Sequence, residues 1–312
     1  MRIAVIGPTL LTKRCLIELL KQKKDRIIAL FTLDDSLAKK KCRSVRFDDI
    51  CSKYRIPLYK VSDINDKKAV EIIRKLSPDV IFELGWSQII TKEILQIPKK
   101  GCIGVHASLL PKNRGGASLN WALIKGAKKW GVTLYYLDED IDKGKIIDQE
   151  SFSITMKDDI KTVHDKSDMA SAELLTRNLD AIRNDTVKPT AQDSKKADYL
   201  PRRSPEDGII DWNKTSLELY NWVRALTHPF PGAFTLYKNK KLFIWKSYLP
   251  DKTENAKPGQ PGQIISIDKE GILVKTKDKS ILLKQLQSEN GIELGAYDFA
   301  KKYTIRIGDM LQ

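Results

Sequence analysis

The sequence predicts an α/β protein in which a Rossmann-like parallel sheet is followed by a smaller, OB-like β-barrel. Short apolar strands alternate with segments of helical spacing through the first half of the 312 residues, which is typical of parallel βαβ units. A stretch rich in Pro, Lys, Arg and Asp ends this alternation at 184–207. Short strands separated by Gly and Asp fill the remainder, and such a series favours a small barrel.

The first domain is expected to span residues 1–190. Its strands are predicted at 3–6, 27–31, 79–84, 102–106 and 132–137, and its helices at 11–22, 70–76, 117–124 and 158–183. In sheets of this kind a ligand binds beyond the carboxyl ends of the strands. Residues that directly follow a strand are therefore the first candidates for a functional site.

The second domain is expected to span 209–312, after a linker at 191–208. A helix is predicted at 216–226, and strands are predicted at 233–237, 242–246, 262–267, 272–275 and 281–285. A chain of this length is typically divided into two domains, at about 150 residues per domain.

The formal net charge of +15 favours anionic partners such as nucleic acid or phosphorylated metabolites. Charge per residue is the same in both predicted domains, so it does not choose between these partners. The four cysteines form no C-x-x-C pair, and no metal site is predicted. We found no apolar run of membrane-spanning length, and the first eight residues fit a strand better than a signal peptide. A cytoplasmic protein without a membrane partner is expected.

His106 is the first candidate for catalysis, because it ends an apolar strand where a ligand crevice should begin. The loop after it contains Arg114, Gly115 and Gly116. Glycines permit a ligand to approach the backbone closely, and arginine can bind a phosphate or carboxylate through two hydrogen bonds.

A second candidate is the acidic loop after the strand at 132–137. It carries Asp138, Glu139, Asp140 and Asp142 and is closed by Gly144. A solvated turn would explain this pattern, but neighbouring carboxylates also raise one another's pKa, which suits a group that handles protons.

Four spaced motifs resemble those of the formyltransferase family: H-A-S-L-L-P-x-x-R-G at 106–115, W-A-L-x-x-G at 121–126, G-V-T-L at 131–134 and D-x-G at 142–144. Segments at 202–208, 210–212, 223–225 and 229–233 also resemble the C-terminal part of two-domain members. The family includes methionyl-tRNA, glycinamide ribonucleotide and amino-sugar formyltransferases. The resemblance covers nearly the whole chain and implies a formyl transfer from 10-formyltetrahydrofolate to a primary amine, without a metal.

The resemblance implies a catalytic trio of Asn, His and Asp. His106 and Asp142 match two members of the trio, but Gly104 occupies the position of the Asn. That amide would donate to the formyl oxygen, and losing one such donor costs about 100- to 1,000-fold in rate. The Gly104 backbone or a water could take its place, as could a side chain from elsewhere, or the chain is a weakened member. The candidate side chains are Ser108, Asn113, Asn120 and Gln88.

By the same resemblance, the folate pocket should be lined by Trp86, Ser87, Gln88, Leu137, Asp138 and Ile141. Trp86 could equally be a packing residue.

The expected acceptor is a nucleotide-linked amino sugar, bound by Ser108, Arg114, Gly115, Asn120, Trp121, Arg202 and Arg203. This reading rests on Asn120-Trp121 and on the 202–208 motif, which resemble those of amino-sugar enzymes.

The first alternative acceptor is methionyl-tRNA, because segment 36–46 carries Lys39, Lys40, Lys41, Arg43 and Arg46 where the tRNA enzymes have a basic loop. A solvated helix start would explain the same residues. The glycinamide ribonucleotide class fits least, since its members usually lack the second domain. A folate- or nucleotide-binding pseudoenzyme is the alternative that the glycine at position 104 leaves open.

Overall fold

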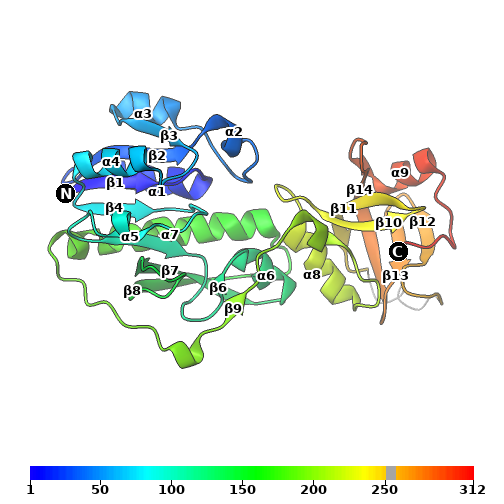
Figure 1. Cartoon of the computed structure of the whole chain (residues 1–312). Helices are drawn as coiled ribbons and strands as arrows, with labels where there is room; N and C mark the ends of the chain where they lie inside the picture. Colours follow the sequence, from blue (N-terminus) through cyan, green and yellow to red (C-terminus); the bar gives the residue numbers. More distant parts are fainter. Residues whose placement is uncertain (251–257) are drawn as a thin grey trace. The chain divides into compact units, whose positions relative to one another are not determined.

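The computed structural model describes residues 1–250 and 258–312, which divide into two compact units (Figure 1). The first unit comprises Met1–Ser118, Lys129–Ser153 and His164–Pro201, and the second comprises Leu119–Lys128, Ile154–Val163 and Arg202–Gln312. The predicted boundary at 191–208 is thus close to the start of the largest piece of the second unit. Two short segments from the first 190 residues also belong to that unit, which the sequence did not indicate.

The described residues of the first unit form a seven-stranded sheet in the order β3-β2-β1-β4-β5-β7-β8. The strands are β1 (Arg2–Ile6), β2 (Arg26–Leu33), β3 (Leu58–Val61), β4 (Val80–Glu83), β5 (Cys102–His106), β7 (Lys129–Tyr136) and β8 (Ile146–Ser153). β1 to β5 are parallel, and the chain changes direction across the sheet between β1 and β4. The mixed α/β class with a Rossmann-like sheet is therefore confirmed.

The two strands at one edge depart from the expected parallel pattern. β7 pairs antiparallel with β5, and β8 pairs antiparallel with β7. Only residues 137–145 join β7 to β8, and so short a connection returns the chain in the opposite direction. These residues include Asp142. β7 ends beside the start of β5, at the pair Ile103–Tyr136, so the loop folds back over the sheet where Asp142 lies beside His106.

Helices pack on both faces of this sheet. One core cluster joins the sheet to buried residues of α1 (Leu10–Leu20), α3 (Asp48–Tyr54) and α7 (Ile160–Arg183). A second cluster joins the other face to α4 (Lys67–Leu76) and α5 (Lys92–Leu95). The short helices α2 (Asp35–Ala38) and α6 (Ser118–Ile124) complete the helices of this part of the chain, and β6 (Arg114–Gly115) pairs with β9 (Tyr199–Leu200).

The second unit contains a six-stranded antiparallel sheet, within residues 202–250 and 258–312, in the order β10-β11-β14-β13-β12 with β15 beside β14. Its strands are β10 (Ala233–Tyr237), β11 (Lys240–Tyr248), β12 (Ile264–Asp268), β13 (Gly271–Lys275), β14 (Ser280–Ser288) and β15 (Leu294–Gly295), with helices α8 (Ser216–Leu226) and α9 (Ala296–Tyr303). Backbone bonds link Gln312 to Leu236 of β10, and Leu311 to Gly262 beside β12. The chain end thereby bridges both edges of the sheet, which gives it the closed character expected of a small barrel.

Across the described ranges, the structure contains no helix that is both long and apolar enough to cross a membrane.

Candidate functional site

Glu83, Gly104, His106 and Tyr135 gather on one face of the first sheet, at the carboxyl ends of β4 and β5. Glu83 ends β4 and lies beside Gly104 of β5, which is also paired with Tyr135 of β7. Gly104 and His106 are two residues apart on one strand, so they share a face. This is the edge where ligands bind in open α/β sheets.

His106 is held between two hydrogen-bond acceptors. Its Nε2 donates to the carbonyl oxygen of Asn113 at 2.9 Å, and its Nδ1 lies 3.5 Å from Oδ1 of Asp142. Each of the two side chains is 10% exposed. The Nε2 bond to Asn113 thus orients the ring so that Nδ1 faces the Asp142 carboxylate. The geometry brings together the histidine and aspartate expected from the sequence.

Asp142 is fixed from both sides. The hydroxyl of Tyr135 donates to Oδ1 at 2.9 Å, and the backbone N–H of Gly115 donates to Oδ2 at 2.8 Å. Burial, together with the nearby charge of Asp142, raises the pKa of Tyr135 well above its usual value, so its hydroxyl stays protonated. The acidic loop is therefore more than a solvated turn at this residue. Tyr135 was missed from the sequence, because it looks like one more apolar residue of its strand.

Gly104 leaves a space that its neighbours fill. A Cβ at this position would lie 2.7 Å from Cδ2 of Leu137, 3.1 Å from Oε2 of Glu83 and 3.4 Å from Cε1 of Tyr135. Glu83 as a whole residue is partly exposed. Removal of its carboxyl group from bulk water nevertheless raises the pKa of Glu83 to about 7. Glu83 was not predicted from the sequence either. Its one signal is that it is a charged residue at the end of the apolar run of β4.

Three of the four side chains proposed to replace the missing Asn are engaged elsewhere. Ser108 is fully buried and donates to the carbonyl of Lys112 at 2.7 Å. Gln88 donates to the carbonyl of Ser62 and accepts from the N–H of Ile64. The Asn120 amide donates to the carbonyl of Ala225 within the second unit. Asn113, the fourth, offers its carbonyl oxygen to His106.

The residues predicted to line the folate pocket lie in the loops after β4 and β7. Trp86 is 9% exposed and donates through Nε1 to Oε1 of Gln88, and both Trp86 and Leu137 pack against the second core cluster. Ser87 and Asp138 are exposed, and Ile141 is 46% exposed. Trp86 and Gln88 thus order their loop, while Ile141 presents an apolar side chain to solvent.

Arg114 does not extend into open space. It is 3% exposed, and its guanidinium donates to Oε1 of Gln192 and to the hydroxyl of Tyr199. The sequence led us to expect that Arg114 binds a substrate phosphate. In the structure its guanidinium N–H groups instead donate to neighbouring side chains and stabilise the loop. Gly115 adopts a φ of +96° and offers its N–H to Asp142, so its role here is to hold the carboxylate.

Asn120, Trp121, Arg202 and Arg203 belong to the second unit. The guanidinium of Arg203 lies 5.2 Å from the ring centre of Trp121 and 4.6 Å from that of Trp222. Burial lowers the pKa of Arg203. Arg203 and Trp121 therefore pack together, and Arg202 is exposed.

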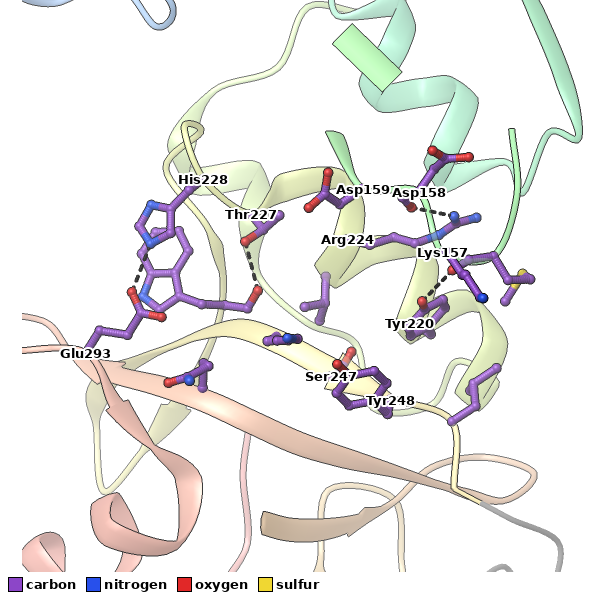
Figure 2. A pocket seen from close by; sticks show the side chains of 16 residues that line it. Lys157, Asp158, Asp159, Tyr220, Arg224, Thr227, His228, Ser247, Tyr248 and Glu293 are labelled. Atoms are coloured by element: carbon purple, nitrogen blue, oxygen red, sulfur yellow. Dashed lines mark hydrogen bonds and ion pairs between the residues drawn. The ribbon is translucent and has the colours of Figure 1, made fainter. Parts of the chain in front are cut away.

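The second unit also has a cavity of about 760 Å³, lined by residues of 156–159, α8, β11 and the loop after α8 (Figure 2). The Arg224 guanidinium donates to the carbonyls of Thr155 and Asp158, each at 2.7 Å, and the His228 ring stacks on Trp245 at 3.8 Å. No residue predicted for the site is among the described residues that line this cavity.

In the parts of the chain that the structure describes, no three His, Cys, Asp or Glu side chains gather as a potential metal site.

Comparison with known families decides which chemistry this arrangement serves. Residues 1–179 match the formyl transferase family, and residues 202–304 match the formyl transferase C-terminal domain. The chain belongs to the formyltransferase family. As a formyltransferase, it carries His106 and Asp142 where the family resemblance expected them, with Gly104 as its departure.

Two relatives of this formyltransferase are named methionyl-tRNA formyltransferase. The protein of Caldicellulosiruptor saccharolyticus is 42% identical over 241 residues, which are 77% of this chain and 76% of the relative. That of Alkaliphilus oremlandii is 32% identical over 313 aligned positions, 100% of this chain and 99% of the relative. The N-formyltransferase of Helicobacter canadensis, solved with folinic acid and dTDP-3-aminofucose, has a TM-score of 0.69 at 20% identity and covers 91% of this chain and 98% of its own. This likeness shows the shared fold.

The expectation of a nucleotide-linked amino sugar as acceptor is therefore wrong. Relatives that are 31–42% identical over most of this formyltransferase are named methionyl-tRNA formyltransferase. The residues behind that expectation offer a physical reason for the error. Asn120 binds a backbone carbonyl, and Arg203 stacks on Trp121, so these motifs reflect packing of the second unit and not the choice of acceptor.

Proposed function

We propose that this formyltransferase transfers a formyl group from 10-formyltetrahydrofolate to the amino group of methionyl-tRNA. The names of relatives that align over most of the chain carry the choice of acceptor. The His106–Asp142 pair at the carboxyl edge of the sheet supports the chemistry.

The transfer forms a bond between the acceptor nitrogen and the formyl carbon and breaks the bond from that carbon to N10 of the folate. One proton must leave the acceptor nitrogen, and one must reach N10. His106 would carry this proton, because an imidazole gains and loses protons near neutral pH. Asp142, 3.5 Å from Nδ1, would stabilise the charged ring while it holds the proton.

The folate would lie against the loops that follow β4 and β7. Ordered residues such as Trp86 give these loops a fixed shape. Ile141 is an exposed apolar side chain that folate binding would cover. Covering apolar surface of this kind is the main favourable term in binding a flat aromatic ring.

In segment 36–46, which is expected to contact tRNA, two of the basic residues are paired with acidic residues of the same chain. Arg43 turns inward to Asp168, at 2.6 Å, and Arg46 pairs with Asp48. Burial lowers the pKa of Lys41. Lys39, Lys40 and Arg46 are exposed. Because Arg46 is paired with Asp48, we assign phosphate attraction to Lys39 and Lys40.

The function is tested with the purified protein, 10-formyltetrahydrofolate and methionyl-tRNA. We expect N-formylmethionine to be released when the tRNA ester is hydrolysed, and we expect no product with uncharged tRNA or free methionine. Absence of formylmethionine at every enzyme concentration, with folate binding intact, would favour the pseudoenzyme instead.

A further inference from the structure

Glu83 provides a carboxyl oxygen at the place where the family resemblance expects an asparagine side chain. Its Oε2 lies 3.1 Å from the position of a Cβ on residue 104. The register of β4 and β5 puts the two residues side by side, on the face that also carries His106. A side chain from the neighbouring strand therefore occupies the space that Gly104 leaves.

The two oxygens of Glu83 have different surroundings. The backbone N–H of Trp86 donates to Oε1 at 2.5 Å, so this oxygen acts as an acceptor. A proton on the carboxyl accordingly belongs on Oε2, which points toward the space above Gly104. In that state Glu83 is a hydrogen-bond donor.

The other donors at this edge are already committed. The hydroxyl of Tyr135 and the N–H of Gly115 both donate to the Asp142 carboxylate. Nε2 of His106 donates to the carbonyl oxygen of Asn113. Attack on a formyl carbon places negative charge on the formyl oxygen, and a positioned donor there contributes strongly to the rate. Oε2 of Glu83 differs from these groups in that it faces the space above Gly104.

We propose that Glu83 is a catalytic residue whose protonated carboxyl donates a hydrogen bond from Oε2 to the formyl oxygen, in place of the amide expected at position 104. This role rests on the proposed formyl transfer. The proton stays on Glu83 throughout, while the acceptor proton travels to N10 by way of Nδ1 of His106, the ring nitrogen that does not donate to Asn113. Bonds and charges therefore balance without a further reactant.

The charges around Glu83 set the pH range in which it can donate. Removal from water and the charge of Asp142 favour the protonated form. The N–H groups of Trp86 and Gly85 and the charge of Lys41 favour the ionised form. Cys102 and Tyr135 also lie close enough to feel its charge. The pKa of about 7 predicts that turnover falls as pH rises through this value, because ionised Glu83 repels the developing oxyanion.

Two substitutions separate donation from mere packing. Glu83→Ala removes the donor and should lower turnover by about 100- to 1,000-fold. Glu83→Gln keeps the shape: its amide oxygen can accept from Trp86 while its NH₂ donates at any pH. It should therefore turn over faster than Glu83→Ala and lack the fall at alkaline pH. Glu71→Gln on the exposed surface of α4 is the matched control and should resemble the wild type.

A second pair of variants tests whether residues 83 and 104 share one position. In the wild type, Gly104→Asn should lower turnover, because its side chain would collide with Leu137 and Glu83. In the Glu83→Ala background the same change should raise turnover, since the amide then enters vacated space. An effect of the same sign in both backgrounds would overturn the proposal, as would an Ala variant as fast as the wild type.

Infrared titration supplies a readout that needs no acceptor. The wild type should show a carboxylic acid band that disappears as pH rises through about 7, and Glu83→Gln should lack it. If this band is absent from the wild type, Glu83 is not protonated and the proposal fails. If the band titrates as expected but methionyl-tRNA is not formylated, the proposed acceptor fails instead.

Discussion

Among single residues, His106 is the one that we propose to carry the proton, and its replacement gives the plainest catalytic prediction. His106→Asn can still donate to the carbonyl of Asn113 but cannot exchange a proton near neutral pH. We expect turnover to fall by about 100- to 10,000-fold, the usual contribution of a positioned acid or base. Folate affinity, followed by fluorescence titration, should stay within a few-fold.

His228→Asn is a suitable control for this change. His228 is a half-exposed histidine that stacks on Trp245 in the second unit, and its replacement should leave turnover intact. If His106→Asn were equally harmless, His106 would have no part in the transfer.

Glu83 should also influence stability, independently of catalysis. Its pKa rises from an ordinary 4.5 to about 7 on folding, so between these values the folded protein holds a proton that the unfolded chain has released. Stability contributed by this group therefore falls as pH rises through this window. Glu83→Gln does not titrate. The melting temperature of this variant minus that of the wild type should therefore increase as pH rises from about 5 to about 8.

Thermal unfolding of both proteins across this range measures the difference. A constant difference in melting temperature would mean that Glu83 titrates normally in the folded state.

Some residues of the candidate site could be predicted from the sequence and others could not. His106 and Asp142 could be predicted because each stands in a motif with fixed spacing. Glu83 could not, since its proximity to Gly104 arises from the register between two strands whose paired residues are 21 positions apart in the sequence (104 − 83). For Arg114 the sequence shows a cation but not its partners in the fold, Gln192 and Tyr199.

At the scale of elements, the loop after β2 carries the prediction about tRNA. The double substitution Lys39→Glu with Lys40→Glu should weaken tRNA binding. Each lost phosphate contact should reduce the slope of log affinity against log salt by about 0.7 to 0.9. Filter-binding or fluorescence titrations at several salt concentrations measure both effects.

Lys23→Glu with Lys24→Glu is the matched control. This exposed pair lies before the amino end of β2, whereas Lys39 and Lys40 follow its carboxyl end. Equal losses from the two pairs would indicate diffuse attraction by net charge and not a loop that meets tRNA.

Most elements followed from the spacing of apolar residues, and the exceptions have physical causes. β8 was not predicted because all but its last residue are partly buried and its sequence mixes charged with apolar side chains, so no alternation appears. β3 has four residues and no fully buried one. The antiparallel course of β7 and β8 depends on a hairpin that strand propensity does not reveal.

At the scale of the whole molecule, the family follows from motifs spread over both units, but the acceptor does not. Residues that distinguish acceptors must touch them, and the motif residues at 120, 121 and 203 contact other parts of the second unit. The net charge of +15 suits an RNA partner, yet it is spread over the chain and would also suit a nucleotide.

A competition between two acceptors in one reaction measures whether methionyl-tRNA is the substrate. The protein receives 10-formyltetrahydrofolate labelled in the formyl carbon, with methionyl-tRNA and a nucleotide-linked 4-amino sugar in the same reaction. We expect the label to appear as N-formylmethionine on tRNA, with a second-order rate constant for tRNA well above that for the sugar. Label that accumulates on the sugar while methionyl-tRNA stays unformylated would contradict the account.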